Sequence, residues 1–367
     1  YIMKIYERSI MEFIKGMDVS MLKELEMCGA VYSLRGTPED LFQILRQTGV
    51  NLIRLRLWHN PYSLQGEDYG GGSNDFQTTV ELAKRAVDQG MEFMLDIHYS
   101  DFWTDPSKQL KPKAWEKMGY PELKDTVYQY TYQTLCDFRD ALAEPHYVQV
   151  GNELTNGFLW PEGHVDCLDQ MAQLLQAGIS AVKSFRTTIP VMLHLDFGTD
   201  NALYRKWFSA IERYQLAFDI IGMSYYPYWN GKMDLLEQNM ADISLRFEKD
   251  IVVAETVIGY TTDNLGCTGM IYSEELAKET DYPPTKEGQQ RFLEDLADAI
   301  RKVPNNRGKG FIYWEPEWLP FAQCAWAKPA GCVYANDKGV LGNSWANQAL
   351  FDAQGNANPA LENLGKL

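Results

Sequence analysis

Two glutamates stand at the ends of short apolar segments that lie about a hundred residues apart in the chain. Glu153 follows residues 146–151, directly after Asn152, and Glu255 follows residues 250–254. An unpaired carboxylate is costly to bury, so a carboxylate at the end of a buried strand is expected to serve chemistry. Two facing carboxylates suit glycoside hydrolysis, in which one is the nucleophile and the other the general acid and then the general base.

The spacing of such a pair would decide the stereochemical course. A gap of about 5 Å between the carboxyls gives retention of configuration, and a gap of about 6.5–9.5 Å gives inversion. The structural alternative for either glutamate is an ion pair with Arg54 or Arg56 inside the fold. The occurrence of both glutamates at equivalent strand ends favours the catalytic interpretation.

The segments that must position these residues alternate between two types. Eight short apolar runs predict strands, and they occupy residues 13–20, 50–58, 91–100, 146–153, 189–196, 218–229, 250–256 and 308–318. Segments with apolar residues at three- and four-residue spacing lie between them and predict helices, over 37–49, 78–90, 123–143, 167–185, 202–214, 233–250 and 286–303, with a short closing helix at 344–352. Eight strand–helix units predict a single-domain (β/α)₈ barrel over residues 1–367.

Two details refine this fold prediction. Thr37 is the expected N-cap of the first long helix, with Pro38 at the first helical position and Gly49 past the end. An open doubly wound sheet is the structural alternative, but no GxGxxG motif follows the first strand.

Polar and aromatic residues gather after successive predicted strands, where a barrel of this kind builds its active site. The candidates for substrate binding are Arg56, Trp58, His98, Asp101, Trp103, Asn152, Tyr225, Tyr226, Trp229, Trp314 and Trp318. The tryptophans suggest a row of platforms on which sugar rings stack, in an open groove rather than a closed pocket.

Several of these motifs resemble one known family. "RLRLWHNP" (54–61), "DIHYSDFWTDPSKQLKPKAW" (96–115), "SYYPYW" (224–229) and "YWEPEW" (313–318) are similar to signatures of the arabinogalactan endo-β-1,4-galactanases. The resemblance runs from "GMDVS" at Gly16 to "NQALFDAQGN" near the C-terminus. "GNE" and "ET" alone mark only the wider clan of retaining barrel glycosidases, whereas the long 96–115 motif is specific.

The resemblance implies a role for each main site residue. Glu153 would be the acid/base, Glu255 the nucleophile, and Asn152 a ligand of the neighbouring sugar hydroxyl. Arg56 and His98 would lie beneath the cleaved sugar, and Tyr226 or Tyr225 would contact the nucleophile. Trp314 would form the floor of the subsite. An Arg56 close to Glu255 would keep that carboxylate ionised, and a more apolar setting would let Glu153 hold its proton.

Some relatives bind calcium after the seventh strand, and the corresponding residues differ here. Residues 256–269 offer only Asp263 and Asn264, and Ala346 stands where those relatives are expected to place an aspartate. Because calcium takes six to eight oxygen ligands, we expect no metal and no other cofactor.

Composition restricts the partners. The net charge of −16 opposes binding to nucleic acid or anionic lipid but carries no such penalty for a neutral ligand such as a sugar. The resemblance implies that this ligand is galactan, and we expect a monomer. No apolar run is long enough to span a membrane.

Cys324 and Cys332 could form a loop disulfide, or all six cysteines could be free. The sequence begins at Tyr1 without a secretory signal, and we expect an extracellular or cell-surface protein whose leader lies outside it.

Three other functions were weighed against galactan hydrolysis. A metal-dependent hydrolase would need an HxH pair, and the five histidines form none. A related enzyme acting on mannan or glucan would share the two glutamates but not the specific motifs. A non-catalytic carbohydrate-binding barrel has no support from the sequence, because both glutamates are present.

Overall fold

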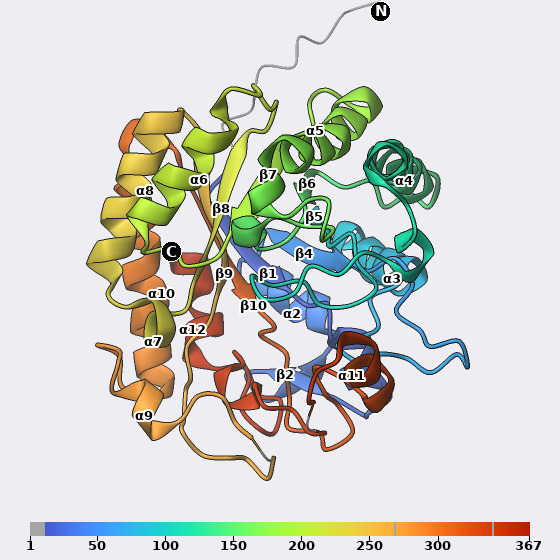
Figure 1. The fold of residues 1–367 in the computed structure, drawn as a ribbon. Helices are drawn as coiled ribbons and strands as arrows, with labels where there is room; N and C mark the ends of the chain where they lie inside the picture. The colour runs from blue at the N-terminus through green and yellow to red at the C-terminus, as the bar shows by residue number, and fades with distance from the viewer. Residues whose placement is uncertain (1–11, 268, 340) are drawn as a thin grey trace, which may run out of the picture.

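The computed structural model describes residues 12–267, 269–339 and 341–367. Within them, eight parallel strands close into a barrel in the order β1-β10-β9-β8-β7-β6-β5-β4, with helices around the outside (Figure 1). The predicted (β/α)₈ barrel is therefore confirmed. The predicted domain boundaries include residues 1–11, which lie outside the described residues.

The barrel strands are β1 (Ile14–Asp18), β4 (Leu52–Leu57), β5 (Glu92–Ile97), β6 (Tyr147–Val150), β7 (Val191–Leu195), β8 (Ile220–Tyr225), β9 (Asp250–Thr256) and β10 (Gly308–Trp314). The longer helices are α3 (Phe76–Asp88), α4 (Tyr120–Asp140), α5 (Leu168–Phe185), α6 (Asn201–Glu212), α8 (Met233–Phe247) and α10 (Lys286–Arg301). Short helices are α1 (Leu22–Met27), α2 (Leu41–Gln47), α7 (Pro227–Asn230), α9 (Glu274–Ala277), α11 (Pro329–Ala335) and α12 (Pro359–Glu362). None of the helices in these ranges has both the length and the apolar character needed to cross a membrane.

The predicted start of the first long helix is wrong. Residues Thr37–Glu39 form β3, which pairs antiparallel with β2 (Tyr32–Leu34), and α2 begins only at Leu41. The carboxylate of Asp40 caps this helix by accepting from the backbone N–H groups of Phe42 and Gln43. Gly49 does follow the helix with a φ of 96°, as expected for a C-terminal glycine.

The predicted closing helix over 344–352 is also wrong, because only a single 3₁₀ turn, Ala346–Gln348, forms there. Side chains of this segment are tied to distant parts of the chain instead. The amide of Asn347 donates to the carbonyl of Tyr272, and the side-chain oxygen of Gln348 accepts from the Tyr228 hydroxyl. These long-range bonds replace the local hydrogen bonds of a helix.

Of the two alternatives for Cys324 and Cys332, the loop disulfide does not form. All six cysteines are free; Cys324 Sγ lies 3.3 Å from Cys28 Sγ, and Cys332 Sγ accepts from the backbone N–H of Gly339. The alternative interpretation, free cysteines, therefore holds.

The interior of the barrel has an apolar layer and a polar layer. The apolar layer consists of Ile14, Leu52, Met94, Tyr147, Met192, Ile220, Val252, Ala254 and Ile312, all buried. Because side chains alternate along a strand, the residue two positions after Leu52, which is Arg54, also faces inward. The same step leads from Met94 to Asp96 and from Met192 to His194, so the polar layer lies at the C-terminal ends of the strands.

An irregularity in β9 places Glu255 in this polar layer. The register between β8 and β9 pairs Met223 with Val253 but Ser224 with Glu255, so Ala254 is an extra residue in β9. Ala254 belongs to the apolar interior, and strict alternation would turn Glu255 outward. The bulge restores its inward direction, as bulges near active sites commonly do.

Gly310 closes the barrel between β10 and β1, and we predict that Gly310→Ala destabilises it. Its φ is 138°, and an added Cβ would lie 2.1 Å from the carbonyl oxygen of Ile14. We expect a loss of at least about 2 kcal/mol in the free energy of unfolding, measured by urea denaturation. Lys309→Ala, next to it on the same strand, is the control and should change stability by less than about 1 kcal/mol. Equal stability of both variants would contradict this view of the closure.

Candidate active site

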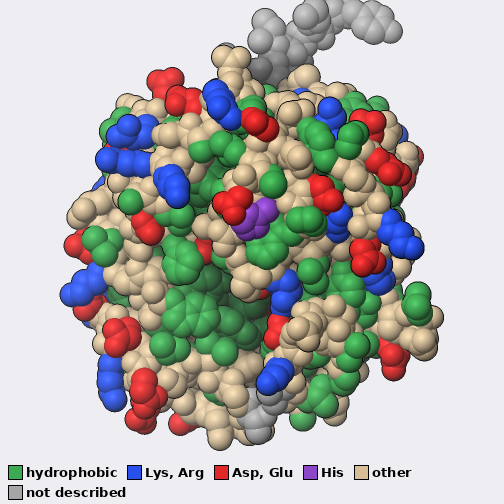
Figure 2. Space-filling model, viewed as in Figure 1, with side chains coloured by type: hydrophobic (Ala, Val, Ile, Leu, Met, Phe, Trp, Pro, Cys, Tyr) green, Lys and Arg blue, Asp and Glu red, His purple; other side chains and the backbone are tan. Residues whose placement is uncertain are grey.

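A cavity of about 870 Å³ opens at the C-terminal ends of the barrel strands. Figure 2 shows this hollow on the face seen in Figure 1, with hydrophobic side chains around it. Of the predicted site residues, its lining contains Arg56, His98, Trp103, Asn152, Glu153, Tyr226, Trp229, Glu255 and Trp314. The two glutamates and most of the predicted binding residues therefore meet at one place.

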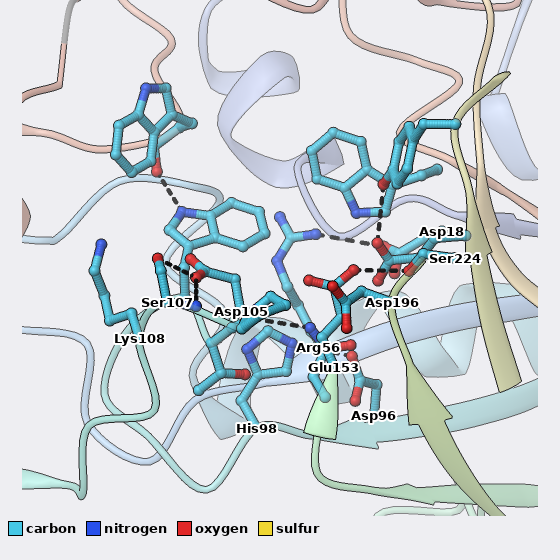
Figure 3. Close-up of a pocket in the computed structure, with 18 of the residues that line it drawn as sticks. Asp18, Arg56, Asp96, His98, Asp105, Ser107, Lys108, Glu153, Asp196 and Ser224 are labelled. Atoms are coloured by element: carbon cyan, nitrogen blue, oxygen red, sulfur yellow. Dashed lines mark hydrogen bonds and ion pairs between the residues drawn. The ribbon is translucent and has the colours of Figure 1, made fainter. Parts of the chain in front are cut away.

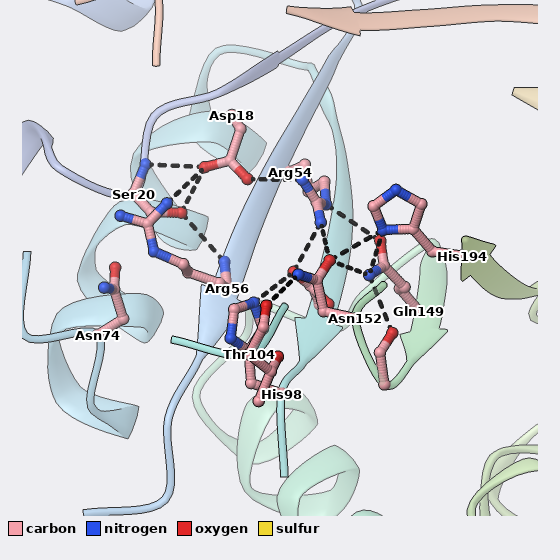
Figure 4. A network of polar contacts seen from close by, with 12 residues as sticks. Asp18, Ser20, Arg54, Arg56, Asn74, His98, Thr104, Gln149, Asn152 and His194 are labelled. Carbon is pink, nitrogen blue, oxygen red and sulfur yellow. Dashed lines mark hydrogen bonds and ion pairs between the residues drawn. The ribbon is translucent and has the colours of Figure 1, made fainter. Parts of the chain in front are cut away.

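Arg54 lies at the centre of the polar layer, with its side chain 1% exposed (Figure 4). Its guanidinium donates to Asp96 Oδ2 at 2.8 Å, Glu255 Oε1 at 2.9 Å, Asn152 Oδ1 at 3.0 Å, Gln149 Oε1 at 3.1 Å and Asp18 Oδ2 at 3.2 Å. Burial alone would lower the pKa of Arg54, but the carboxylates of Asp96, Glu255 and Asp18 raise it above its ordinary value. Arg54 is thus a permanent buried cation that five acceptors surround.

The carboxylate of Glu255 accepts from two donors. Arg54 donates to one carboxylate oxygen at 2.9 Å, and the Tyr226 hydroxyl donates to the other at 2.9 Å. The prediction that Arg56 would lie next to Glu255 is wrong. Arg56 pairs with Glu315 and lies 3.6 Å from Asp18 on the β1 side of the barrel, while Arg54, two residues earlier, reaches the glutamate.

Glu153 is in a different setting. It has a left-handed backbone (φ 47°) after β6 and is partly buried, and its Oε1 lies 2.7 Å from the hydroxyl oxygen of Ser224 (Figure 3). Burial raises the pKa of Glu153 well above its ordinary value, and the negative charges of Glu255 and Asp196 add to this rise, whereas a hydrogen bond donated by Ser224 would lower it. Ser224 is paired with Glu255 across β8 and β9, so the two carboxyls face one region of the cavity.

Gly151 allows the chain to turn toward Glu153 after β6. Its φ is 76°, and a Cβ at this position would lie 2.6 Å from a methyl carbon of Leu154. A residue with a side chain would therefore be strained in its backbone and would clash. This explains the glycine that precedes Asn152 and Glu153.

A network of amides and one imidazole connects Arg54 to Glu153. Asn152 Oδ1 lies 3.0 Å from Gln149 Nε2 and 2.9 Å from His194 Nδ1, and Asn152 Nδ2 donates to the carbonyl of Thr104 at 2.9 Å. His194 Nε2 lies 2.9 Å from Ser224 Oγ. Within the described part of the chain, the network leaves one amide hydrogen of Asn152 without a protein acceptor, and this residue lines the cavity.

Aromatic rings form the walls of the cavity. Trp314 packs edge-on against Trp345 at 4.9 Å between ring centroids, and Trp345 packs against Trp229 at 5.9 Å. On the other side, Trp103 lies 5.9 Å from Trp314 and stacks on the guanidinium of Arg56 at 4.1 Å. These rings suit the apolar faces of sugar rings.

Four predicted binding residues do not line the cavity, and their expected contact with substrate is corrected. Trp58, Asp101, Tyr225 and Trp318 are each at most 1% exposed. Each has a partner inside the protein: the Trp58 N–H donates to His98 Nδ1, the Asp101 carboxylate accepts from the backbone N–H groups of Asn60 and Lys113, Tyr225 donates to the carbonyl of Gly231, and Trp318 packs on Trp314. Through these contacts Trp58 and Trp318 support His98 and Trp314, which line the cavity.

Several residues of the site are not among the predicted binding residues, although Arg54 is the ion-pair partner that the structural alternative expected for a glutamate. These are Asp18, Arg54, Asp96, Gln149, His194, Asp196, Ser224, Trp326 and Trp345. Alternation could have identified part of this set, since Arg54 and Arg56 occupy one face of a strand and Gln149 and His194 are single polar residues in apolar strands. Nothing in the local sequence marks Trp326 or Trp345, which lie in loops after β10.

The residues expected near a calcium site do not fit one. Asn264 Oδ1 accepts from the backbone N–H of Gly266, and Ala346, buried in its turn, has no side-chain oxygen. In the part of the chain that the structure describes, no group of three or more His, Cys, Asp or Glu residues could hold a metal ion.

Comparison with known proteins places the whole barrel in one family. The profile described as glycosyl hydrolase family 53 matches residues 14–364. The endo-beta-1,4-galactanase of Bacillus subtilis (strain 168) is 34% identical over 96% of this chain and 85% of its own length. The arabinogalactan endo-beta-1,4-galactanase of Cellvibrio japonicus is 33% identical, with 95% and 89% covered. Among solved structures, the Ignisphaera aggregans GH53 catalytic domain superposes with a TM-score of 0.90 at 38% identity, covering 96% of both chains.

The raised pKa of Glu153 predicts that Glu153→Gln stabilises the protein at alkaline pH. A carboxyl whose pKa is higher in the folded than in the unfolded state loses stabilisation as pH rises from its ordinary value, near 4.3, toward the raised one. The amide cannot ionise, so the gain in unfolding free energy should grow from pH 4 to pH 8 and reach about 1–2 kcal/mol. Urea denaturation at both pH values measures it.

The matched control for this prediction is Glu116→Gln, at an exposed glutamate. It should leave the pH dependence of stability close to that of the wild type. If Glu153→Gln were no more stable than the wild type at pH 8, the interpretation of Glu153 as a carboxyl held protonated would be wrong.

Proposed function

The chain belongs to glycosyl hydrolase family 53, and from this premise we propose that it cleaves internal β-1,4-galactosidic bonds of galactan with retention of anomeric configuration. The observation that carries the proposal is the difference between the two glutamates. Glu255 accepts from Arg54 and Tyr226, whereas Glu153 has a raised pKa and, among the residues that the structure describes, no cation within ion-pair distance. One carboxylate and one carboxylic acid are the pair that a retaining glycosidase requires.

The proposed reaction has two steps. Glu255 attacks the anomeric carbon while Glu153 donates its proton to the departing glycosidic oxygen, which leaves a covalent galactosyl-enzyme ester at Glu255. Glu153, now a carboxylate, then removes a proton from water, and the water oxygen attacks the anomeric carbon and frees Glu255. Two inversions at the same carbon give net retention.

The cavity supports a neutral carbohydrate chain as substrate. Its walls are largely aromatic, and the free amide hydrogen of Asn152 is available to a sugar hydroxyl near the two glutamates. His98 cannot serve as a second free donor, because Trp58 donates to its Nδ1 and its Nε2 faces Asp96 at 3.0 Å. The names of the curated relatives support galactan within this class. Since such a polymer is too large to enter a cell, we propose an extracellular or cell-surface location.

Substrate identity is tested by product analysis. We expect galacto-oligosaccharides from linear β-1,4-galactan and no products from β-1,4-mannan or cellulose under the same conditions, measured by chromatography of the reducing sugars. Oligosaccharides of several lengths at early times would agree with internal cleavage. Activity on mannan or cellulose but not on galactan would contradict the substrate, and galactose as the sole early product would contradict internal cleavage.

Chemical rescue tests the two roles. Glu255→Ala should lower kcat by at least about 10³-fold, because the covalent route is lost. Azide should restore turnover of an activated aryl β-galactoside and give an α-galactosyl azide, since it attacks the face that Glu255 vacates. Glu153→Ala should instead give a β-galactosyl azide, because the ester at Glu255 still forms. NMR determines the anomeric configuration of each galactosyl azide. If Glu255→Ala gave the β-azide and Glu153→Ala the α-azide, the two proposed roles would be reversed.

A further inference from the structure

A continuous row of hydrogen-bonding groups leads from Arg54 to the carboxyl of Glu153. Arg54 contacts Asn152 Oδ1 at 3.0 Å, His194 Nδ1 lies 2.9 Å from the same oxygen, and Ser224 Oγ lies 2.9 Å from His194 Nε2. Ser224 Oγ then lies 2.7 Å from Glu153 Oε1. Apart from Glu153, these residues are at most 5% exposed, so water does not substitute freely for any partner.

Arg54 fixes the direction of the first bonds in this row. A guanidinium only donates, so the atom of Asn152 facing it is the oxygen. The other side of that amide agrees, because Asn152 Nδ2 donates to the carbonyl of Thr104 at 2.9 Å. Arg54 likewise fixes Gln149, whose Oε1 accepts from its Nε at 3.1 Å.

The fixed amide of Asn152 in turn selects one tautomer of His194. An oxygen 2.9 Å from Nδ1 needs a hydrogen on that nitrogen. Gln149 Nε2 does not compete, because it lies 3.3 Å from Nδ1 but 3.0 Å from both Asn152 Oδ1 and the carbonyl of Gly151. Burial, aided by the charge of Arg54, lowers the pKa of His194 well below its ordinary value, so the ring is neutral. Its Nε2 therefore carries a lone pair and must accept.

The hydroxyl of Ser224 has a single hydrogen, and it donates that hydrogen to His194 Nε2. Ser224 then presents an oxygen lone pair to Glu153 Oε1, 2.7 Å away, and a bond at this distance needs a hydrogen on the carboxyl. From this geometry we propose that Ser224 and His194 are positioning residues that hold Glu153 in its protonated form. The inference rests on the proposed function in assigning Glu153 as the acid.

These hydrogen bonds rearrange when Glu153 gives its proton to the departing oxygen. The Ser224 hydroxyl turns to donate to the new carboxylate, and His194 Nε2 loses its donor until the proton of the attacking water returns to Glu153. Ionisation of Glu153 thus costs one buried hydrogen bond. The other ionisable groups facing Glu153 are Asp105 in the loop after β5, Asp196 after β7, Tyr204 on α6, Tyr226 after β8 and Glu255 on β9.

The tautomer of His194 is the first test, and it does not depend on any substrate. Long-range ¹H–¹⁵N correlation of the ¹⁵N-histidine protein should show the His194 ring with hydrogen on Nδ1 and none on Nε2. The resonances that disappear in His194→Gln assign it. Hydrogen on Nε2, or on both nitrogens, at neutral pH would mean that His194 donates to Ser224. That result would overturn the proposal, whatever the substrate of the enzyme.

The second test is the alkaline limb of the pH profile of kcat/KM. Ser224→Ala removes the acceptor that the protonated carboxyl uses, so the limb should move to lower pH by roughly one unit, and Ser224→Thr should restore it. If Ser224 instead donates to a carboxylate, Ser224→Ala moves the limb to higher pH. That outcome, or no movement, overturns the proposal.

A control separates this effect from the general loss of a buried hydroxyl. Thr131 on α4 is 0% exposed and contacts the Tyr99 hydroxyl, and Thr131→Val should leave the limb in place. An activated aryl β-galactoside serves as substrate, so that bond cleavage can be followed without galactan. If no galactoside is cleaved at all, the proposed function fails, while the tautomer measurement still decides the state of the row.

Discussion

The arrangement of this site depends on one buried cation that must be neutralised and fully hydrogen-bonded. Arg54 lies inside the barrel at 1% exposure, and a bare charge there would be prohibitive to bury. Its five acceptors come from strands β1, β5, β6 and β9 and from the turn after β6. The need to satisfy this cation therefore brings side chains from around the barrel to one point. Removing one partner would leave a buried N–H group of Arg54 without that acceptor, which is costly.

The same cation makes the two glutamates different. Glu255 accepts directly from the guanidinium at 2.9 Å, whereas Glu153 is connected to Arg54 only through Asn152, His194 and Ser224. Through that route the cation acts by fixing hydrogen-bond directions rather than by its charge. Direct contact with Arg54 thus supports the nucleophile proposed for Glu255, and the indirect connection supports the acid proposed for Glu153.

Much of the fold and part of the site could be predicted from the sequence, because both follow from local patterns. Eight apolar runs alternating with amphipathic segments predict the barrel, and strand ends predict where Asn152, Glu153 and Glu255 gather. Helix boundaries near Pro38 failed, since a hairpin pairing with Tyr32–Leu34 outweighed the helix signal. The direction of Glu255 depends on a bulge at Ala254, and a bulge is set by pairing between strands rather than by the strand's own residues.

The errors among the arginines and tryptophans have a related cause. Arg54 and Arg56 share one face of one strand, and only their height in the barrel decides which of them meets Glu255. Trp58 and Trp318 are as aromatic as Trp314, but they are covered by other rings, and loops after β10 supply Trp326 and Trp345 to the wall instead.

The difference in the state of the two glutamates is tested most directly by trapping with an activated 2-deoxy-2-fluoro-β-galactoside, followed by mass spectrometry of the peptides. The label should lie on Glu255, the carboxylate in contact with Arg54; a label on Glu153, or turnover without any covalent label, would contradict the account.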